Sequence, residues 1–157
     1  MKSTVCAVLG LLAAGQSLEL RLAAVGRDAV FVEPASVVAE GDRRTFRALR
    51  IVAGGEPIAG ELYYGGWQRA AIDCRKRTFH DLSFQSLRES GAVGPDRPSN
   101  EAPYPIVRGS VEDGLADAVC RRRYLNRDAP ASVAEAARLG RLRIEENTQT
   151  LLRRGRG

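Results

Sequence analysis

Hydrophobic and polar residues alternate in the first part of the chain, with the period of two that is typical of half-buried β-strands. Leu18–Val25 begins Leu-Glu-Leu-Arg-Leu, and Ala29–Val32 is a short run of residues that favour strands. A turn signal separates them at residues 26–28. Pro34–Val38 predicts one tight helical turn. This part of the chain therefore predicts short strands joined by tight connections.

A longer strand is predicted for Arg43–Val52, after a turn at Gly41 and Asp42. Alternation divides its side chains between two faces, and neither face is purely apolar. One face carries Arg47, Leu49 and Ile51, and the other carries Phe46, Ala48 and Arg50. The pattern leaves open which face is buried.

Two further strands are predicted for Trp67–Cys74 and Thr78–Gln85, which a charged turn joins. Between the long strand and this pair, Ala53–Gly66 is rich in glycine. It is interpreted as a loop or as a hairpin with an irregular tip, with the glycine pairs at 54–55 and 65–66 as turns. After the pair, Ser90–Pro105 is interpreted as an irregular connection, because it is rich in proline and turn-forming residues.

The hydrophobic period then changes to that of a helix in Ser110–Arg121. Ser110 is a good N-cap and acidic residues follow it in the first turn. The apolar stripe consists of Val111, Leu115, Ala118 and Val119. Strands that come first and a helix that comes last predict an α+β fold, with a C-terminal helix packed on an antiparallel sheet.

A second helical segment is predicted for Asp128–Gly157, with Asp128 or Ser132 as its N-cap. Its apolar face is loose, and Gly140 and Asn147 are interpreted as weakening it. This basic helix is either a solvated extension or a peripheral contact with an anionic surface of the envelope.

The N-terminal segment Met1–Ser17 has the layout of a secretory signal peptide, with Lys2 followed by the apolar run Val5–Ala14. The run is too short to span a bilayer. The alternative is a buried N-terminal helix or strand. The predicted organisation is a signal peptide at 1–17, an α+β domain at 18–122 and a basic helical extension at 123–157. Such a protein is exported to the periplasm or to the outer cell surface.

The number of cysteines also bears on whether the protein is exported to an oxidising compartment. Removal of the signal takes Cys6 with it and leaves Cys74 and Cys120. An even pair in an oxidising compartment is a candidate disulfide, and the alternative is two free buried thiols.

The net charge of +5 is unevenly distributed. Residues 121–157 carry ten arginines and four acidic residues, whereas residues 3–120 carry thirteen basic and fifteen acidic residues. The predicted domain is therefore slightly acidic, which argues against a nucleic-acid partner, because such a protein carries its positive charge on the folded domain.

The sequence predicts no catalytic residues, no metal site and no cofactor. His80 is the single histidine, and its neighbour Asp81 points to the opposite face of the predicted strand. There is no Cys-x-x-Cys motif, no histidine pair and no phosphate-binding glycine loop. A pair of carboxylates among the acidic residues remains the alternative for a hydrolase.

A cluster of aromatic residues is the candidate binding site. Tyr63, Tyr64 and Trp67 lie at the glycine-rich segment, and Arg69 follows them. Tyrosine, tryptophan and arginine dominate the energetics of protein interfaces. The alternative is that Trp67 and one of the tyrosines fill the core.

Three segments of the chain resemble the surface-adhesin E-like family of small exported bacterial proteins: Ala29–Val38 (AVFVEPASVV), Ala71–Ser83 (AIDCRKRTFHDLS) and Ser110–Cys120 (SVEDGLADAVC). The resemblance implies an antiparallel sheet with a packed helix and a Cys74–Cys120 bridge. It also implies a role at the envelope or surface, with adhesion to host or matrix proteins, and it supplies no catalytic motif.

The expected function is therefore that of an exported envelope or cell-surface binding module for a protein ligand or an envelope component. One alternative is a periplasmic structural or interaction protein. The other is a hydrolase that uses an unidentified carboxylate pair.

Overall fold

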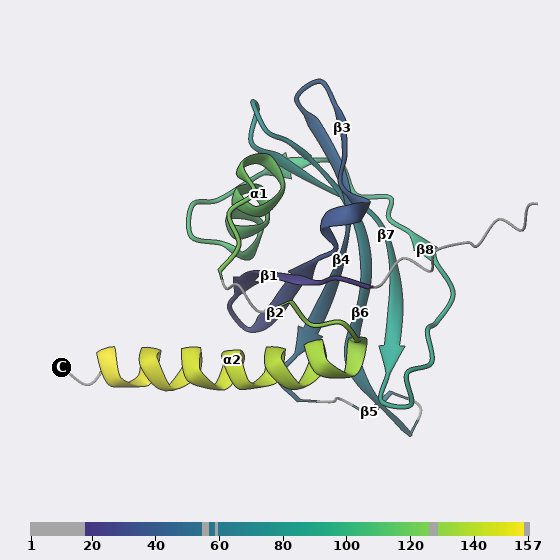
Figure 1. Ribbon diagram of the computed structural model, residues 1–157, viewed down its shortest axis with the longest axis vertical. Coiled ribbons are helices and arrows are strands. Elements are labelled where there is room, and N and C mark those ends of the chain that lie inside the picture. Colours follow the sequence, from purple (N-terminus) through teal and green to yellow (C-terminus); the bar gives the residue numbers. More distant parts are fainter. Residues whose placement is uncertain (1–17, 55–56, 59, 126–128, 156–157) are drawn as a thin grey trace, which may run out of the picture.

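The computed structural model describes residues 18–54, 57–58, 60–125 and 129–155, and it shows a curled antiparallel sheet followed by two helices (Figure 1). The predicted α+β fold is confirmed. The strands are β1 (Arg21–Val25), β2 (Asp28–Val32), β3 (Val38–Glu40), β4 (Arg43–Val52), β5 (Pro57–Ile58), β6 (Glu61–Asp73), β7 (Thr78–Arg88), β8 (Arg97–Pro98) and β9 (Tyr104–Pro105). The helices are the 3₁₀ turn η1 (Pro34–Ser36), α1 (Val111–Arg121) and α2 (Val133–Arg154). The predicted signal peptide lies outside the described residues.

The main sheet runs in the order β1-β2-β4-β6-β7-β8, and each neighbouring pair is antiparallel. The short strands β3, β5 and β9 pair with β4, β6 and β7. Figure 1 shows β1 and β2 running across the direction of β6 and β7, with α1 on one side of them and α2 on the other. The sheet therefore offers two faces to two different helices.

The packing of β4 explains why neither of its two faces is purely apolar in the sequence. Phe46 and Ala48 belong to a core that includes residues of α1, whereas Leu49 and Ile51 belong to a core that includes residues of α2. Both faces of β4 are buried because a helix packs on each of them. Burial on both faces removes the simple alternation that a one-sided strand would show.

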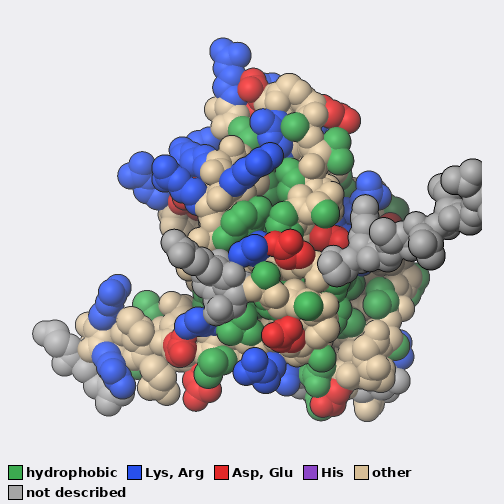
Figure 2. Space-filling model, in the orientation of Figure 1, with side chains coloured by type: hydrophobic (Ala, Val, Ile, Leu, Met, Phe, Trp, Pro, Cys, Tyr) green, Lys and Arg blue, Asp and Glu red, His purple; other side chains and the backbone are tan. Residues whose placement is uncertain are grey.

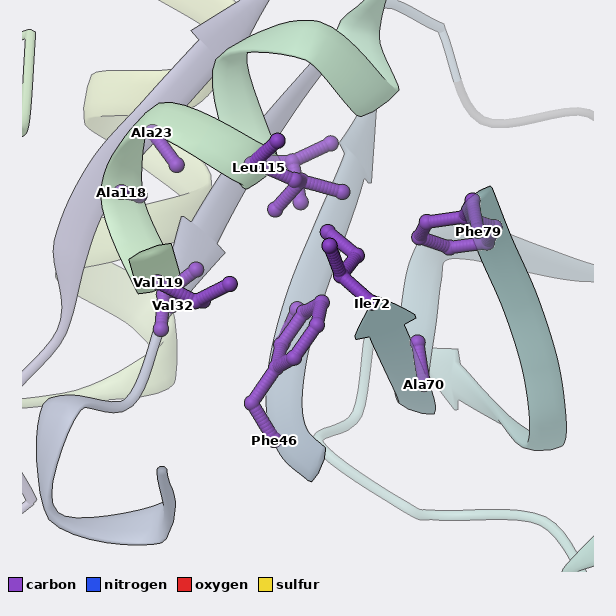
Figure 3. Packing of buried hydrophobic residues seen from close by; sticks show 12 residues of the cluster. Ala23, Val32, Phe46, Ala70, Ile72, Phe79, Leu115, Ala118 and Val119 are labelled. Atoms are coloured by element: carbon purple, nitrogen blue, oxygen red, sulfur yellow. The ribbon is translucent and has the colours of Figure 1, made fainter. Parts of the chain in front are cut away.

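The apolar stripe of α1 packs on the sheet, as the sequence predicts. Leu115 and Val119 face Phe46 and Ile72 of the sheet (Figure 3). The helix begins where expected, because the Ser110 Oγ accepts a hydrogen bond from the Asp113 N–H at 3.2 Å. This packing fixes α1 against strands β1, β2 and β4.

Helix α2 begins after Ser132, whose Oγ accepts a hydrogen bond from the Glu135 N–H at 3.1 Å. The alternative cap Asp128 lies outside the described residues. The first half of α2 packs on the sheet through Ala136, Ala137 and Ile144. The second half extends past the sheet (Figure 1), and Leu151 and Leu152 are exposed there.

The interpretation of Gly140 as a weakness of this helix is wrong. Gly140 is fully covered by the sheet, and a Cβ at this position would lie 3.1 Å from the Ile51 Cβ and 3.2 Å from the Ala29 Cβ. The missing side chain allows the helix to approach β2 and β4 closely. Gly140 is therefore part of the packing surface.

Of the two interpretations of Ala53–Gly66, the hairpin is confirmed and the loop is wrong, because β5 pairs with β6, which already begins at Glu61. Gly65 and Gly66 lie inside a strand and not in a turn. Gly65 has a φ of +130°, and the register between β6 and β7 is irregular between Tyr63 and Gly65. Glycine here serves a bulge in a long strand, which its sequence does not distinguish from a turn. The interpretation of 90–105 as irregular overlooked the short strands β8 and β9.

Candidate binding site

The two tyrosines predicted as binding residues, Tyr63 and Tyr64, are adjacent on β6 and point to opposite faces of the sheet. Tyr64 packs against the core beneath α2, where its hydroxyl donates a hydrogen bond to Glu89 Oε1 at 3.1 Å. The Arg141 guanidinium of α2 lies 4.1 Å from the centre of the Tyr64 ring. Tyr63 lines a hollow on the other face. Tyr64 is thus already engaged within the protein, whereas Tyr63 faces an open space.

Trp67 is a core residue, with 5 % of its surface exposed. The Arg47 guanidinium lies 3.7 Å from the centre of its ring, and the same arginine reaches Glu33 at 3.5 Å. Arg69 is exposed and lies directly opposite Arg47 across the strand pair. The structure therefore places Tyr64, Trp67 and Arg69 on the face that α2 partly covers, and it separates them from Tyr63.

The hollow at Tyr63 has a volume of about 540 Å³. Its lining is mostly apolar, and it includes Val52, Gly54, Tyr63, Gly65, Phe84, Ser86 and Arg97. The Phe84 side chain is 40 % exposed, which is unusual for a large aromatic residue. Sites of this size with apolar walls and few polar groups are typical of ligand recognition.

Gly66 leaves room for the Phe84 ring in this position, because it has no side chain. A Cβ on Gly66 would lie 2.3 Å from the Phe84 Cζ and 2.3 Å from the Gln85 carbonyl oxygen. The phenyl ring thus occupies the space that a side chain at residue 66 would take, which compensates a glycine within a strand. The same contact keeps one side of the ring open to the hollow.

Sequence reasoning missed Val52, Phe84 and Arg97 as neighbours of Tyr63. Phe84 lies in a segment that was expected to be a strand, and its exposure depends on the glycine across from it. The register of β6 with β7 brings Phe84 next to Gln68 and Ser86 next to Gly66. No local pattern in the sequence gives that register, because it is irregular at two positions.

The predicted disulfide is present between Cys74 and Cys120, with the two Cα atoms 5.8 Å apart. It joins the turn after β6 to the last turn of α1. The Arg77 guanidinium from the same turn donates a hydrogen bond to Asp113 at the other end of α1. The pKa of Asp113 is lowered by a hydrogen bond from the Gly109 N–H and then by the Arg77 guanidinium. Both ends of α1 are therefore tied to this turn.

The described residues do not assemble a catalytic group around His80. Asp81 accepts a hydrogen bond from the Gln68 side chain, whereas His80 lines a different hollow with Arg43 and Asp73. The described residues contain no group of three or more histidine, cysteine or acidic side chains that could hold a metal ion. Within the same part of the chain, no helix combines the length and the apolarity needed to cross a bilayer.

The described residues thus form a disulfide-linked α+β domain with an apolar hollow on its surface. Residues 20–121 match the sequence model of the family described as surface-adhesin protein E. Because the match covers more than half of the chain, the chain belongs to this family. The resemblance found in the three sequence segments is confirmed, and it gives the protein a surface adhesin-like role.

A solved structure of Haemophilus influenzae protein E is similar to this chain at 13 % sequence identity, with a TM-score of 0.47. The alignment covers 73 % of this chain and 92 % of that one. No curated protein sequence matches the chain.

Proposed function

We propose that the protein is an exported, non-enzymatic binding module that holds a host or matrix protein at the cell surface. Family membership supports the surface role. The main support for a binding site is the hollow at Tyr63, where a large aromatic side chain, Phe84, stays exposed beside apolar walls. An apolar or aromatic side chain of the ligand enters this hollow, and the ligand backbone or a carboxylate meets Arg97 at its edge.

Tyr63 and Tyr64 give a matched pair of variants, because they are adjacent and face opposite ways. The assay measures binding of the purified protein to a panel of immobilised matrix glycoproteins. Tyr63→Ser should weaken binding by about thirtyfold, as loss of an interface hot spot does, and should leave the melting temperature unchanged. Tyr64→Ser should retain binding and lose stability, because it removes the contacts with Glu89 and Arg141.

Wild-type affinity in Tyr63→Ser would reject the hollow as the site, and the absence of binding to every protein of the panel would reject the matrix ligand. The compartment is tested by protease treatment of intact cells. Cleavage supports display at the surface. Protection until the outer envelope is opened makes the protein periplasmic and excludes adhesion.

A further inference from the structure

A second hollow, of about 610 Å³, lies where the last turn of α1, the strand β3 and the chain entering β1 meet (Figure 2). It is remote in the sheet from Tyr63 and shares no lining residue with the hollow there. The uncharged residues of its lining, which we call the floor, are Pro34, Val37, Ala39, Ala118, Val119, Cys120 and Tyr124. We call this surface the α1–β3 groove.

Positive charge surrounds this floor. Arg21, Arg44 and Arg122 line the groove together with one acidic residue, Glu19. Glu19 already accepts a hydrogen bond from the Arg21 Nε at 2.8 Å, so its charge is balanced within the rim. The lining therefore favours an anionic ligand.

One of the three arginines is held in place by the backbone. The Arg44 Nη1 donates to the Gly41 carbonyl at 2.6 Å and to the Arg43 carbonyl at 3.0 Å. These neutral acceptors orient the guanidinium without neutralising its charge. Arg122 is the C-cap of α1, in the left-handed conformation with a φ of +54°, and it also lines the groove.

The groove also borders an open strand edge. Strand β3 pairs with β4 on one side, and its three residues are exposed. Among the described residues no strand pairs with the other side of β3. The free backbone groups of an edge strand accept an added strand from another chain.

We propose that the α1–β3 groove binds an extended acidic peptide segment of a partner protein by strand addition to β3. The backbone of the peptide pairs with β3 and every second side chain faces the groove, where apolar side chains meet the floor and carboxylates pair with Arg44 and Arg122. An open strand edge favours a peptide over a lipid or a sugar, because only a peptide offers a regular row of backbone amides to pair with it. The proposal stands on a different site from the proposed function and does not depend on it.

Neighbouring arginines supply matched controls. Arg43 and Arg44 are adjacent in β4 and point to opposite faces, and Arg43 lines the separate hollow that contains His80. Arg122 and Arg123 are adjacent at the end of α1, and Arg123 is not in the lining of the groove. Reversal of either charge within a pair changes the net charge equally, so a difference within a pair reports the groove.

The probe is a fluorescein-labelled peptide of two Leu-Thr-Glu-Thr repeats, in which Leu and Glu share one face of a strand, and its affinity for the full chain is measured by fluorescence anisotropy. The comparison probes are a Leu-Thr-Lys-Thr peptide, an acidic peptide of the same composition in another order, and phosphatidylglycerol vesicles. Arg44→Glu and Arg122→Glu should each weaken binding of the Leu-Thr-Glu-Thr peptide by about tenfold. Arg43→Glu and Arg123→Glu should change it by less than about twofold.

Amide resonances of Val38–Glu40 should shift on binding, which identifies the strand edge directly. Circular dichroism confirms that each variant is folded, and the second pair of variants replaces the first if Arg44→Glu does not fold. Equal losses within the pairs, equal binding of the reordered peptide, or binding of the vesicles in place of the peptide would each overturn the proposal.

Discussion

At the scale of single residues, the proposed binding surface depends on two adjacent glycines that have different roles. Gly66 makes room for the Phe84 ring, whereas Gly65 takes a backbone conformation that side chains rarely adopt. A Cβ on Gly65 would also lie 1.9 Å from the Arg50 carbonyl oxygen. Backbone atoms of a central strand do not move aside easily. Gly65 is therefore required by the sheet itself, independently of any ligand.

Gly65→Ala should lower the free energy of unfolding by about 2 kcal/mol or more, because it combines a strained φ with a backbone clash. Gly54→Ala is the matched control, since nothing lies within 4 Å of a Cβ at that position. The control should stay within about 0.5 kcal/mol of the wild type. Urea unfolding measures both variants. Equal stability of Gly65→Ala and Gly54→Ala would contradict the bulge described at Gly65.

At the scale of secondary structure elements, the start of α1 is fixed by hydrogen bonds that converge on one carboxylate. Asp113 accepts from the Gly109 N–H at 2.8 Å and from the Arg77 side chain, and its own N–H donates to Ser110. A carboxylate in the first turn of a helix also interacts favourably with the helix dipole. These contacts require the ionised form, which is why the pKa of Asp113 lies below its ordinary value.

The stability that Asp113 provides should therefore depend on pH. A carboxylate whose pKa is lowered by folding contributes fully above its unfolded value of 3.8 and loses this contribution as the pH falls through its folded pKa. Asp113→Asn should destabilise the protein at pH 7 and have a much smaller effect at about pH 2. Urea unfolding at several pH values measures this, with Glu112→Gln as the control in the same turn. A loss in Asp113→Asn that does not vary with pH would contradict a role for the charge.

At the scale of the whole molecule, two helices pack on opposite faces of one sheet, and each helix covers a separate hydrophobic core. Helix α1 is tied covalently through Cys120, whereas α2 is held by packing through residues such as Gly140 and Ile144. The two hollows lie where neither helix covers the sheet surface completely. The arrangement of the helices thus determines where the sheet surface stays open.

Reduction of the disulfide should lower the free energy of unfolding by about 4 kcal/mol, because the bridge restricts a long loop in the unfolded chain. The two cysteines are 46 residues apart in the sequence. Unfolding in urea with and without a reductant gives the difference. The double variant Cys74→Ser, Cys120→Ser should show no response to the reductant. A wild-type protein that keeps its stability while both thiols are shown to be free would contradict this prediction.

Local patterns determined much of the fold. The sequence by itself predicted the strands at 18–25, 29–32, 43–52, 67–74 and 78–85, the cap at Ser110 and the two helical segments, because the period of a strand or a helix depends on neighbouring residues. It also selected Cys74 and Cys120. Tyr63 was selected from residue type, without knowledge of the face to which it points.

Only the tertiary structure decided how these elements use their surfaces. The bulge at Gly65, the packing of α2 through Gly140 and the contact of Phe84 with Gly66 all depend on residues that are distant in the sequence. A strand that is covered on both faces shows no simple alternation of polar and apolar residues. The sequence around a glycine does not show whether it lies in a turn or in a bulge. For that reason the sequence determined the longer elements, and long-range packing decided where the short strands pair and which side chains remain exposed.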